Sequence, residues 1–169
     1  DPITTYGGFK AHAERAILER FATTGFPGSI ARPAAIYGPE NNIHDMETAM
    51  FLRLRRELPI LLPHEGLVTT SYGHVDDLCR NLLEMAQLPA AIGEVVNITG
   101  QGCSARAFTQ TLAQIVGVEP EIIELPTDFT QEKPIYGHLF GVKHHGILSV
   151  AKAASLGLTV ERGFLSGYT

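Results

Sequence analysis

A tyrosine and a lysine stand four residues apart near the beginning of the sequence, in the run Tyr6-Gly7-Gly8-Phe9-Lys10. On a helix, this spacing places both side chains on one face. A free phenol has a pKa near ~10 and transfers protons poorly at neutral pH, but a neighbouring ammonium favours the phenolate form. The pair could therefore move a proton on and off a substrate hydroxyl or carbonyl while a hydride passes to a nicotinamide. The alternative is an exposed aromatic beside a solvated lysine, which the same spacing also produces.

The elements that must position this pair alternate between helix and strand along the sequence. Apolar periodicity predicts helices over residues 9–22, 46–58, 105–116 and 149–156, and a further one that begins after Asp76 or Asp77 and runs to about Leu88. Short apolar runs between turn residues predict strands over residues 29–36, 68–75, 94–99 and 121–125. Either Asp76 or Asp77 is expected to cap the third helix, and Ser104 the fourth. This alternation predicts an α/β fold with a largely parallel sheet.

Composition narrows the class of protein. With 169 residues, 44% of them hydrophobic and 18% charged, the chain is expected to form one globular unit over residues 1–169. A net charge of −5 argues against a nucleic-acid partner. Apolar tracts such as Ile60–Leu62 are too short to span a membrane, and no export signal is recognisable. Cys79 and Cys103 lack zinc-site spacing and are expected to stay reduced, as in a cytoplasmic protein.

Three further motifs follow the tyrosine–lysine pair, and the first two surround expected strand ends. They are Arg32-Pro33-Ala34-Ala35-Ile36-Tyr37-Gly38-Pro39, Tyr72-Gly73-His74-Val75-Asp76-Asp77 and Gly93-Glu94-Val95-Val96-Asn97-Ile98. In order and spacing, the four motifs resemble the extended short-chain dehydrogenase/reductase superfamily, the NAD-dependent epimerases and dehydratases. The resemblance extends from Tyr6 to about Leu158.

The resemblance implies a role for each motif. Tyr6 would be the catalytic acid/base, and Lys10 would favour its phenolate and hydrogen-bond the nicotinamide ribose of NAD or NADP. The residues expected along the nicotinamide are Pro33, Ala34 and Ile36. The residues expected beside the small-molecule substrate are Ala35, Asn42 and His74, with Asp77 a structural cap. A homodimer through the helix of the pair is also implied.

The resemblance also implies the architecture, namely the C-terminal half of a Rossmann-like parallel-sheet domain with a small substrate-binding lobe. Strands 29–36 and 94–99 would form the sheet, with 68–75 nearby, and the lobe would include 46–63 and the region after Gly117. No glycine-rich phosphate fingerprint follows a strand here, and no catalytic serine or threonine precedes Tyr6. We therefore expect the missing half to precede Asp1, and this chain to be inactive alone.

Two departures concern the substrate. Sugar-nucleotide members commonly have asparagine where this chain has Ala35, and an arginine shortly before the His-Val-x-Asp segment. The stretch Val68–Ser71 contains no arginine, so a bidentate partner for a diphosphate is absent there. These departures leave room for another carbonyl or alcohol substrate.

Several other polar residues have two readings. His144 and His145, with His138, lack a carboxylate at ligand spacing and are expected to be solvated or at the edge of the core rather than metal ligands. His44, Asp45 and Glu47 could form a pocket rim or simply a helix start. Asn41 and Asn42 could be substrate contacts or turn residues. For the whole chain, the alternative function is that of an atypical, non-catalytic family member that binds RNA or protein, as the chloroplast stem-loop RNA-binding proteins do.

Overall fold

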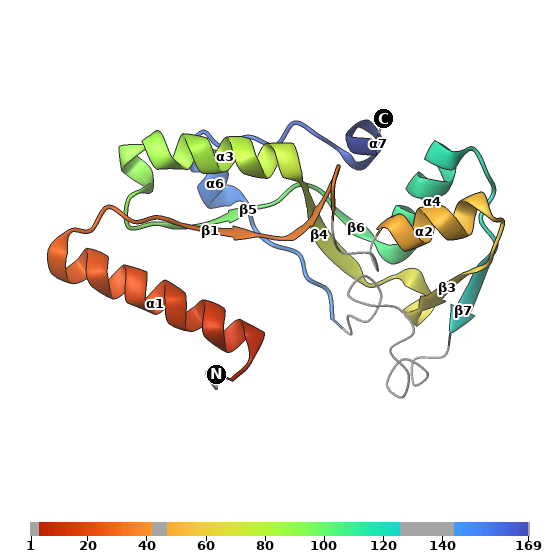
Figure 1. The fold of residues 1–169 in the computed structure, drawn as a ribbon, viewed down its shortest axis with the longest axis horizontal. Helices are drawn as coiled ribbons and strands as arrows, with labels where there is room; N and C mark the ends of the chain where they lie inside the picture. The colour runs from red at the N-terminus through yellow and green to blue at the C-terminus, as the bar shows by residue number, and fades with distance from the viewer. Residues whose placement is uncertain (1–3, 42–46, 126–143, 169) are drawn as a thin grey trace.

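The computed structural model describes residues 4–41, 47–125 and 144–168, which form an α/β fold. Figure 1 shows two connected parts: one contains α1, β1, α3, β5 and α6, and the other contains α2, β3, α4 and β7. The helices are α1 (Tyr6–Thr24), α2 (Glu47–Arg55), α3 (Val75–Gln87), α4 (Ala105–Val116), α6 (Ala151–Ser155) and α7 (Phe164–Tyr168). Short 3₁₀ turns cover His64–Gly66 and Pro89–Ala91.

The strands pair mostly in parallel, as the sequence predicts. They are β1 (Ile30–Pro33), β2 (Ala35–Tyr37), β3 (Ile60–Pro63), β4 (Thr69–His74), β5 (Val95–Ile98), β6 (Gly102–Ser104) and β7 (Ile122–Leu125). β1 pairs with β5, β2 with β4 and β3 with β7, all in parallel, while β4 and β6 are antiparallel. The predicted strand 29–36 is thus divided between two sheets, and β3 and β6 are strands that the sequence pattern did not indicate.

Two hydrophobic cores support the two parts. In the first, Met85 of α3, Val96 and Ile98 of β5 and Ala153 of α6 are buried together. The second core belongs to the part with α2, β3, α4 and β7, which we call the lobe. Here Phe108 of α4 stacks on Tyr72 of β4 with ring centres 5.2 Å apart. Phe164 of α7 meets both rings edge-on, at 5.3 Å and 5.0 Å. The C-terminal helix therefore completes the core of the lobe.

The caps of the helices agree with the sequence in one case and differ in another. Ser104 caps α4, and Gly117 ends it in a left-handed conformation, as predicted. The cap expected of Asp76 or Asp77 is wrong, because His74 is the N-cap of α3 and its Nδ1 accepts a hydrogen bond from the Asp76 amide at 3.1 Å. Asp77 lies one turn further into the helix and has another partner.

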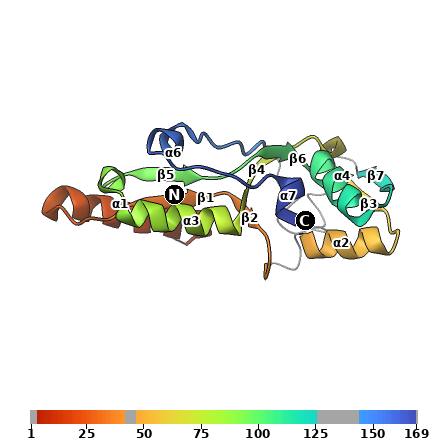
Figure 2. The same cartoon turned by 90° about the horizontal axis from the view of Figure 1, so that it is seen from above.

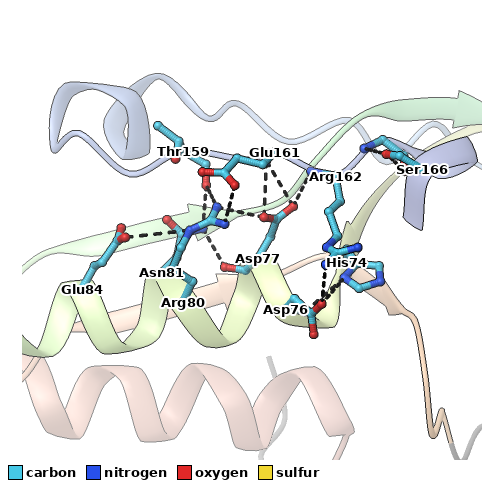
Figure 3. Close-up of polar contacts among 11 residues, drawn as sticks. His74, Asp76, Asp77, Arg80, Asn81, Glu84, Thr159, Glu161, Arg162 and Ser166 are labelled. Carbon is cyan, nitrogen blue, oxygen red and sulfur yellow. Dashed lines mark hydrogen bonds and ion pairs between the residues drawn. The ribbon is translucent and has the colours of Figure 1, made fainter. Parts of the chain in front are cut away.

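Asp77 joins α3 to the C-terminal segment, as Figure 3 shows. Its carboxylate is buried and accepts hydrogen bonds from the backbone amides of Glu161 and Arg162, the latter at 2.9 Å. Arg80 forms an ion pair with Asp77 at 2.8 Å and another with Glu161 at 3.2 Å. The buried charge is thus compensated by an opposite charge and by two amides.

Among the described helices, none has the length and apolar character needed to cross a membrane.

We expect Asp77→Asn to lower the free energy of unfolding by about 2–4 kcal/mol, because it leaves two partly buried amides and Arg80 without their charged acceptor. Urea denaturation followed by circular dichroism measures this change. Asp76→Asn is the matched control: this side chain is 57% exposed and paired with Arg162 at the surface, so its loss should cost at most about 1 kcal/mol. Equal effects of the two substitutions would contradict the role assigned to Asp77.

Candidate active site

The tyrosine–lysine pair lies on the first turns of α1. Thr5 caps this helix, and its Oγ1 accepts a hydrogen bond from the Gly8 amide at 3.0 Å. Lys10 Nζ lies over the Tyr6 ring, 5.5 Å from its centre. The two side chains therefore share one face of the helix, as their spacing predicts. The Tyr6 side chain is 80% exposed, so the pair is open to a ligand.

An ion pair fixes α1 beside β1. Glu14 follows Lys10 by one helical turn, and both of its carboxylate oxygens accept hydrogen bonds from Arg32, one of them from Nε at 2.8 Å. Arg32 directly precedes Pro33 at the end of β1. The arginine lowers the pKa of Glu14, chiefly through these hydrogen bonds. The helix carrying the pair is thereby held in register with the strand end that the resemblance places along the nicotinamide.

The rest of α1 contacts the protein at its far end. Phe21 packs over Gly93, where a Cβ atom would lie 2.4 Å from the phenylalanine ring, so only glycine allows this approach. Gly8 is the buried residue of the helix, and Phe9 is 59% exposed. Figure 1 shows α1 running antiparallel to β1, and in Figure 2 the helix again lies along β1. Its beginning, with Tyr6 and Lys10, is therefore at the carboxyl end of β1.

The residues predicted along the nicotinamide lie at the break between β1 and β2. Pro33 ends β1 and is exposed, Ala34 separates the strands, and Ala35 and Ile36 begin β2. Ala34, Ala35 and Ile36 are half-buried, so each has surface for a ligand. Ligands of parallel α/β sheets bind at the carboxyl ends of strands, which is where this break lies.

His74 and Asn42, predicted beside the substrate, have different settings. The His74 ring is 1% exposed and packs edge-on against Tyr37 with centres 5.2 Å apart. In the structure this side chain caps α3. The predicted contact of His74 with the substrate stays a prediction. Asn42 lies outside the described residues, as do His44, Asp45 and His138.

The neighbouring Asn41 and Glu47 form a pair that the sequence left undecided between turn and pocket rim. The Asn41 amide donates to both carboxylate oxygens of Glu47, at 3.0 Å each. Glu47 is buried at the beginning of α2. Its carboxylate is therefore used within the protein, and this contact joins the turn after β2 to the lobe.

The buried tyrosines cannot replace Tyr6 as proton-transfer groups. Burial, with the nearby carboxylate of Asp77, raises the pKa of Tyr37 to about 12. Burial also raises the pKa of Tyr72 and of Tyr168 above the ordinary value. These three phenols stay protonated at neutral pH. Among the described tyrosines, Tyr6 is the exposed one.

His145 and Cys103 have structural settings. His145 Nδ1 accepts a hydrogen bond from the Thr69 amide at 3.1 Å, which attaches its segment to β4. Burial raises the pKa of the Cys103 thiol to about 11, so it is not a nucleophile at neutral pH. Within the described ranges, no group of three or more His, Cys, Asp or Glu side chains could hold a metal ion.

Comparison with known proteins identifies the family. Residues 1–99 match the model of the NAD dependent epimerase/dehydratase family. The match covers more than half of the chain, and the chain belongs to this family.

Two curated relatives and a solved structure are similar to the chain. It is 34% identical over 101 residues to the chloroplast stem-loop binding protein of 41 kDa b from Arabidopsis thaliana, covering 58% of this chain and 26% of that protein. It is 28% identical over 127 residues to dTDP-L-rhamnose 4-epimerase from Burkholderia thailandensis, covering 72% of this chain and 35% of that protein. The UDP-glucuronic acid 4-epimerase of Bacillus cereus, solved with UDP-glucuronic acid and NAD, superposes with a TM-score of 0.76 at 20% identity.

The structural match covers 99% of this chain and 51% of the Bacillus cereus chain. The chain thus spans about half the length of that structure, and a smaller share of both curated relatives. At this level of identity the superposition establishes the fold. The predicted Rossmann-like α/β architecture is confirmed.

We expect Glu14→Gln to loosen the attachment of α1, because the neutral amide cannot form the charge-assisted pair with Arg32. Hydrogen exchange of the α1 amides, corrected for intrinsic rates, measures this as faster exchange. Since the pKa of Glu14 is lower in the folded protein than in the unfolded chain, the pair stabilises the fold at neutral pH. That contribution is lost as the pH falls below the ordinary glutamate value of about 4.3.

Glu19→Gln makes the same chemical change on the same helix, at a residue whose side chain is exposed, and should leave α1 protection unchanged. If Glu14→Gln retained the protection of the unmodified protein and the same acid dependence, the ion pair would not hold the helix.

Proposed function

We propose that the protein is an NAD(P)-dependent oxidoreductase or epimerase/dehydratase that acts on a hydroxyl or carbonyl group through Tyr6 and Lys10. The observation that carries this proposal is the contact of the Lys10 ammonium with the exposed Tyr6 ring, on a helix bound through Glu14 to the strand end at Arg32. A binding module has no need for such a pair. The family match supports the same chemistry.

The residues at the strand break fit the nicotinamide end of NAD(P). Pro33, Ala34 and Ile36 offer backbone and apolar surface at the carboxyl end of β1, and the Lys10 ammonium is a donor suited to ribose hydroxyls. When bound, the nicotinamide accepts or returns a hydride. The solved Bacillus cereus epimerase, similar in fold, contains NAD. Which of the two dinucleotides binds depends on contacts to the adenosine ribose.

In the proposed reaction, Tyr6 transfers the proton and Lys10 assists it. Tyr6 Oη takes the proton of the substrate hydroxyl as a carbonyl forms, and returns a proton to the oxygen when the carbonyl is reduced. The Lys10 ammonium stabilises the negative charge on the phenolate between these steps. Glu14 and Arg32 keep α1 beside the strand end, so that the proton and the hydride leave neighbouring atoms of the substrate.

For the substrate, a sugar nucleotide is the first candidate, because the relatives include a dTDP-sugar epimerase and a structure with a UDP-sugar. Ala35 and Asn42 are the residues we propose beside it, with His74 supporting the strand-to-helix turn. Thr70 and its neighbours on β4 provide no arginine for a diphosphate, so a smaller hydroxyl or carbonyl compound belongs in the same assay. The exposed Phe9 on α1 supports a homodimer through that helix.

We expect Tyr6→Phe to lower turnover by about 10²–10⁴-fold, because it removes the hydroxyl that transfers the proton. Turnover of UDP- and dTDP-sugars is measured on the natural protein with NAD or NADP, by chromatography of the sugar products for an epimerase or dehydratase and by nicotinamide absorbance for a net oxidoreductase. His12→Gln, on the same exposed helix, should turn over normally. Wild-type turnover in Tyr6→Phe would remove Tyr6 from the mechanism.

The similarity to a stem-loop binding protein favours one other candidate, binding of RNA without catalysis. Arg55 and Arg56 at the end of α2 are exposed and could contact phosphates, whereas Arg53 donates to the Pro59 carbonyl at 2.9 Å. The net charge of −5 opposes this candidate.

We therefore expect no salt-sensitive binding of a stem-loop RNA in a filter-binding assay from low to physiological salt. Tight binding that falls steeply with salt, and that Arg55→Gln with Arg56→Gln weakens, would instead establish the RNA-binding candidate.

A further inference from the structure

A cavity of about 490 Å³ lies between β5, α3 and the segment that includes α6 and residues 158–163. Its size is within the range of small-molecule pockets. No residue of α1, β1 or β2 lines it, so it is separate from the candidate active site.

The walls of this cavity are mainly apolar. Ile98 comes from β5, Ala153 and Ala154 come from α6, and Leu158 and Val160 come from the segment that follows. Gly100 follows β5 in the sequence, and a Cβ atom at this position would be 2.9 Å from the Tyr72 carbonyl oxygen and 3.3 Å from the Val160 side chain. Glycine thus allows Val160 and the backbone after β5 to approach closely on one side of the cavity.

The charged residues at the cavity already have partners. Glu161 is paired with Arg80 at 3.2 Å, and Arg162 with Asp76 at 3.1 Å. A charged ligand would have to displace one of these ion pairs. The cavity therefore favours an uncharged molecule.

Asn81 contributes a polar group that the surrounding protein does not use. Its side chain is 1% exposed and rises from α3 toward Thr159 in Figure 3. The amide nitrogen donates to the Asp77 carbonyl at 2.7 Å and to the Thr159 carbonyl at 2.9 Å. The amide oxygen Oδ1 has no hydrogen-bond partner among the described residues. A buried acceptor without a donor is costly, and a ligand N–H or O–H would remove that cost.

We propose that this cavity binds a small, uncharged, largely apolar ring compound that carries an N–H or O–H donor for Asn81 Oδ1. The apolar walls hold the ring, and the asparagine oxygen fixes its orientation. Such a ligand would contact α3, β5 and the C-terminal segment together. Because that segment continues into α7, whose Phe164 is part of the lobe core, the ligand would also strengthen the attachment of the lobe.

Indole and benzofuran are matched probes for this site, because they have nearly the same rings and only indole has a donor. In ¹H–¹⁵N spectra of the protein, indole is expected to shift the Gly100 and Ala153 amides and the Asn81 side-chain amide, with a Kd on the order of 1 mM or tighter. Benzofuran is expected to bind about 5–10-fold more weakly, the usual worth of one hydrogen bond. Indole should also raise the Tm.

Ala154→Phe tests the location, because Ala154 is exposed on α6 and lines the cavity, so a phenylalanine there can fill it. This variant is expected to lose indole binding. Ala151→Phe, on the same helix and outside the cavity lining, should retain it.

Three outcomes would overturn the proposal: no indole binding, which would mean a cavity that holds only water; equal affinity for the two probes, which would remove Asn81 from recognition; or indole binding retained in Ala154→Phe. None of these results depends on catalysis by Tyr6.

Discussion

The extended segment from Ile30 to Tyr37 pairs with two different strands. The arrangement of the two parts of the molecule depends on this change of pairing. Its first half is bonded to β5 and its second half to β4. A strand that changes partners must leave one sheet, and here it does so at Ala34. The break joins the part with α1 and α3 to the lobe, and it exposes residues at the carboxyl end of β1. The proposed nicotinamide site therefore lies where the backbone pairing changes.

The C-terminal segment connects the same two parts a second time. Asp77 holds the backbone of Glu161 and Arg162 against α3, and Phe164 then packs edge-on against the stacked rings of Tyr72 and Phe108 in the aromatic core of the lobe. A buried carboxylate is tolerated here because two amides and Arg80 compensate its lost hydration. Two separate connections restrict movement of the lobe relative to the strand break. Such rigidity suits the proposed function, in which proton and hydride transfer must be aligned.

The helix of the proposed catalytic pair is attached in a different way, by a surface ion pair toward one end and an aromatic contact at the other. Exposed ion pairs contribute little to stability, on the order of 0.2–1 kcal/mol, but a bidentate arginine–carboxylate contact defines orientation well. Glu14 thus orients Tyr6 and Lys10 relative to Pro33 more than it stabilises the fold. The apolar surface around Phe9 remains exposed on this helix, and a second copy of the chain is the partner that we propose for it.

The sequence by itself determined the described helices other than α7, most strands, the Ser104 and Gly117 caps and the shared face of Tyr6 and Lys10. All of these depend on periodicity or spacing within a few neighbouring residues. Only the tertiary structure decided the partners of Asp77 and Glu14, since Asp77 bonds a residue 84 positions away and Glu14 one 18 positions away. Two carboxylates with similar neighbours cannot be told apart from the sequence alone, because only the packing of the chain brings a hydrogen-bond donor to one of them. The cap by His74 is a local contact with the amide two residues further on, and the sequence analysis missed it because aspartate is the commoner capping residue. The division of strand 29–36 and the cavity at Asn81 were decided by the tertiary structure, because each requires segments that meet only in the folded chain.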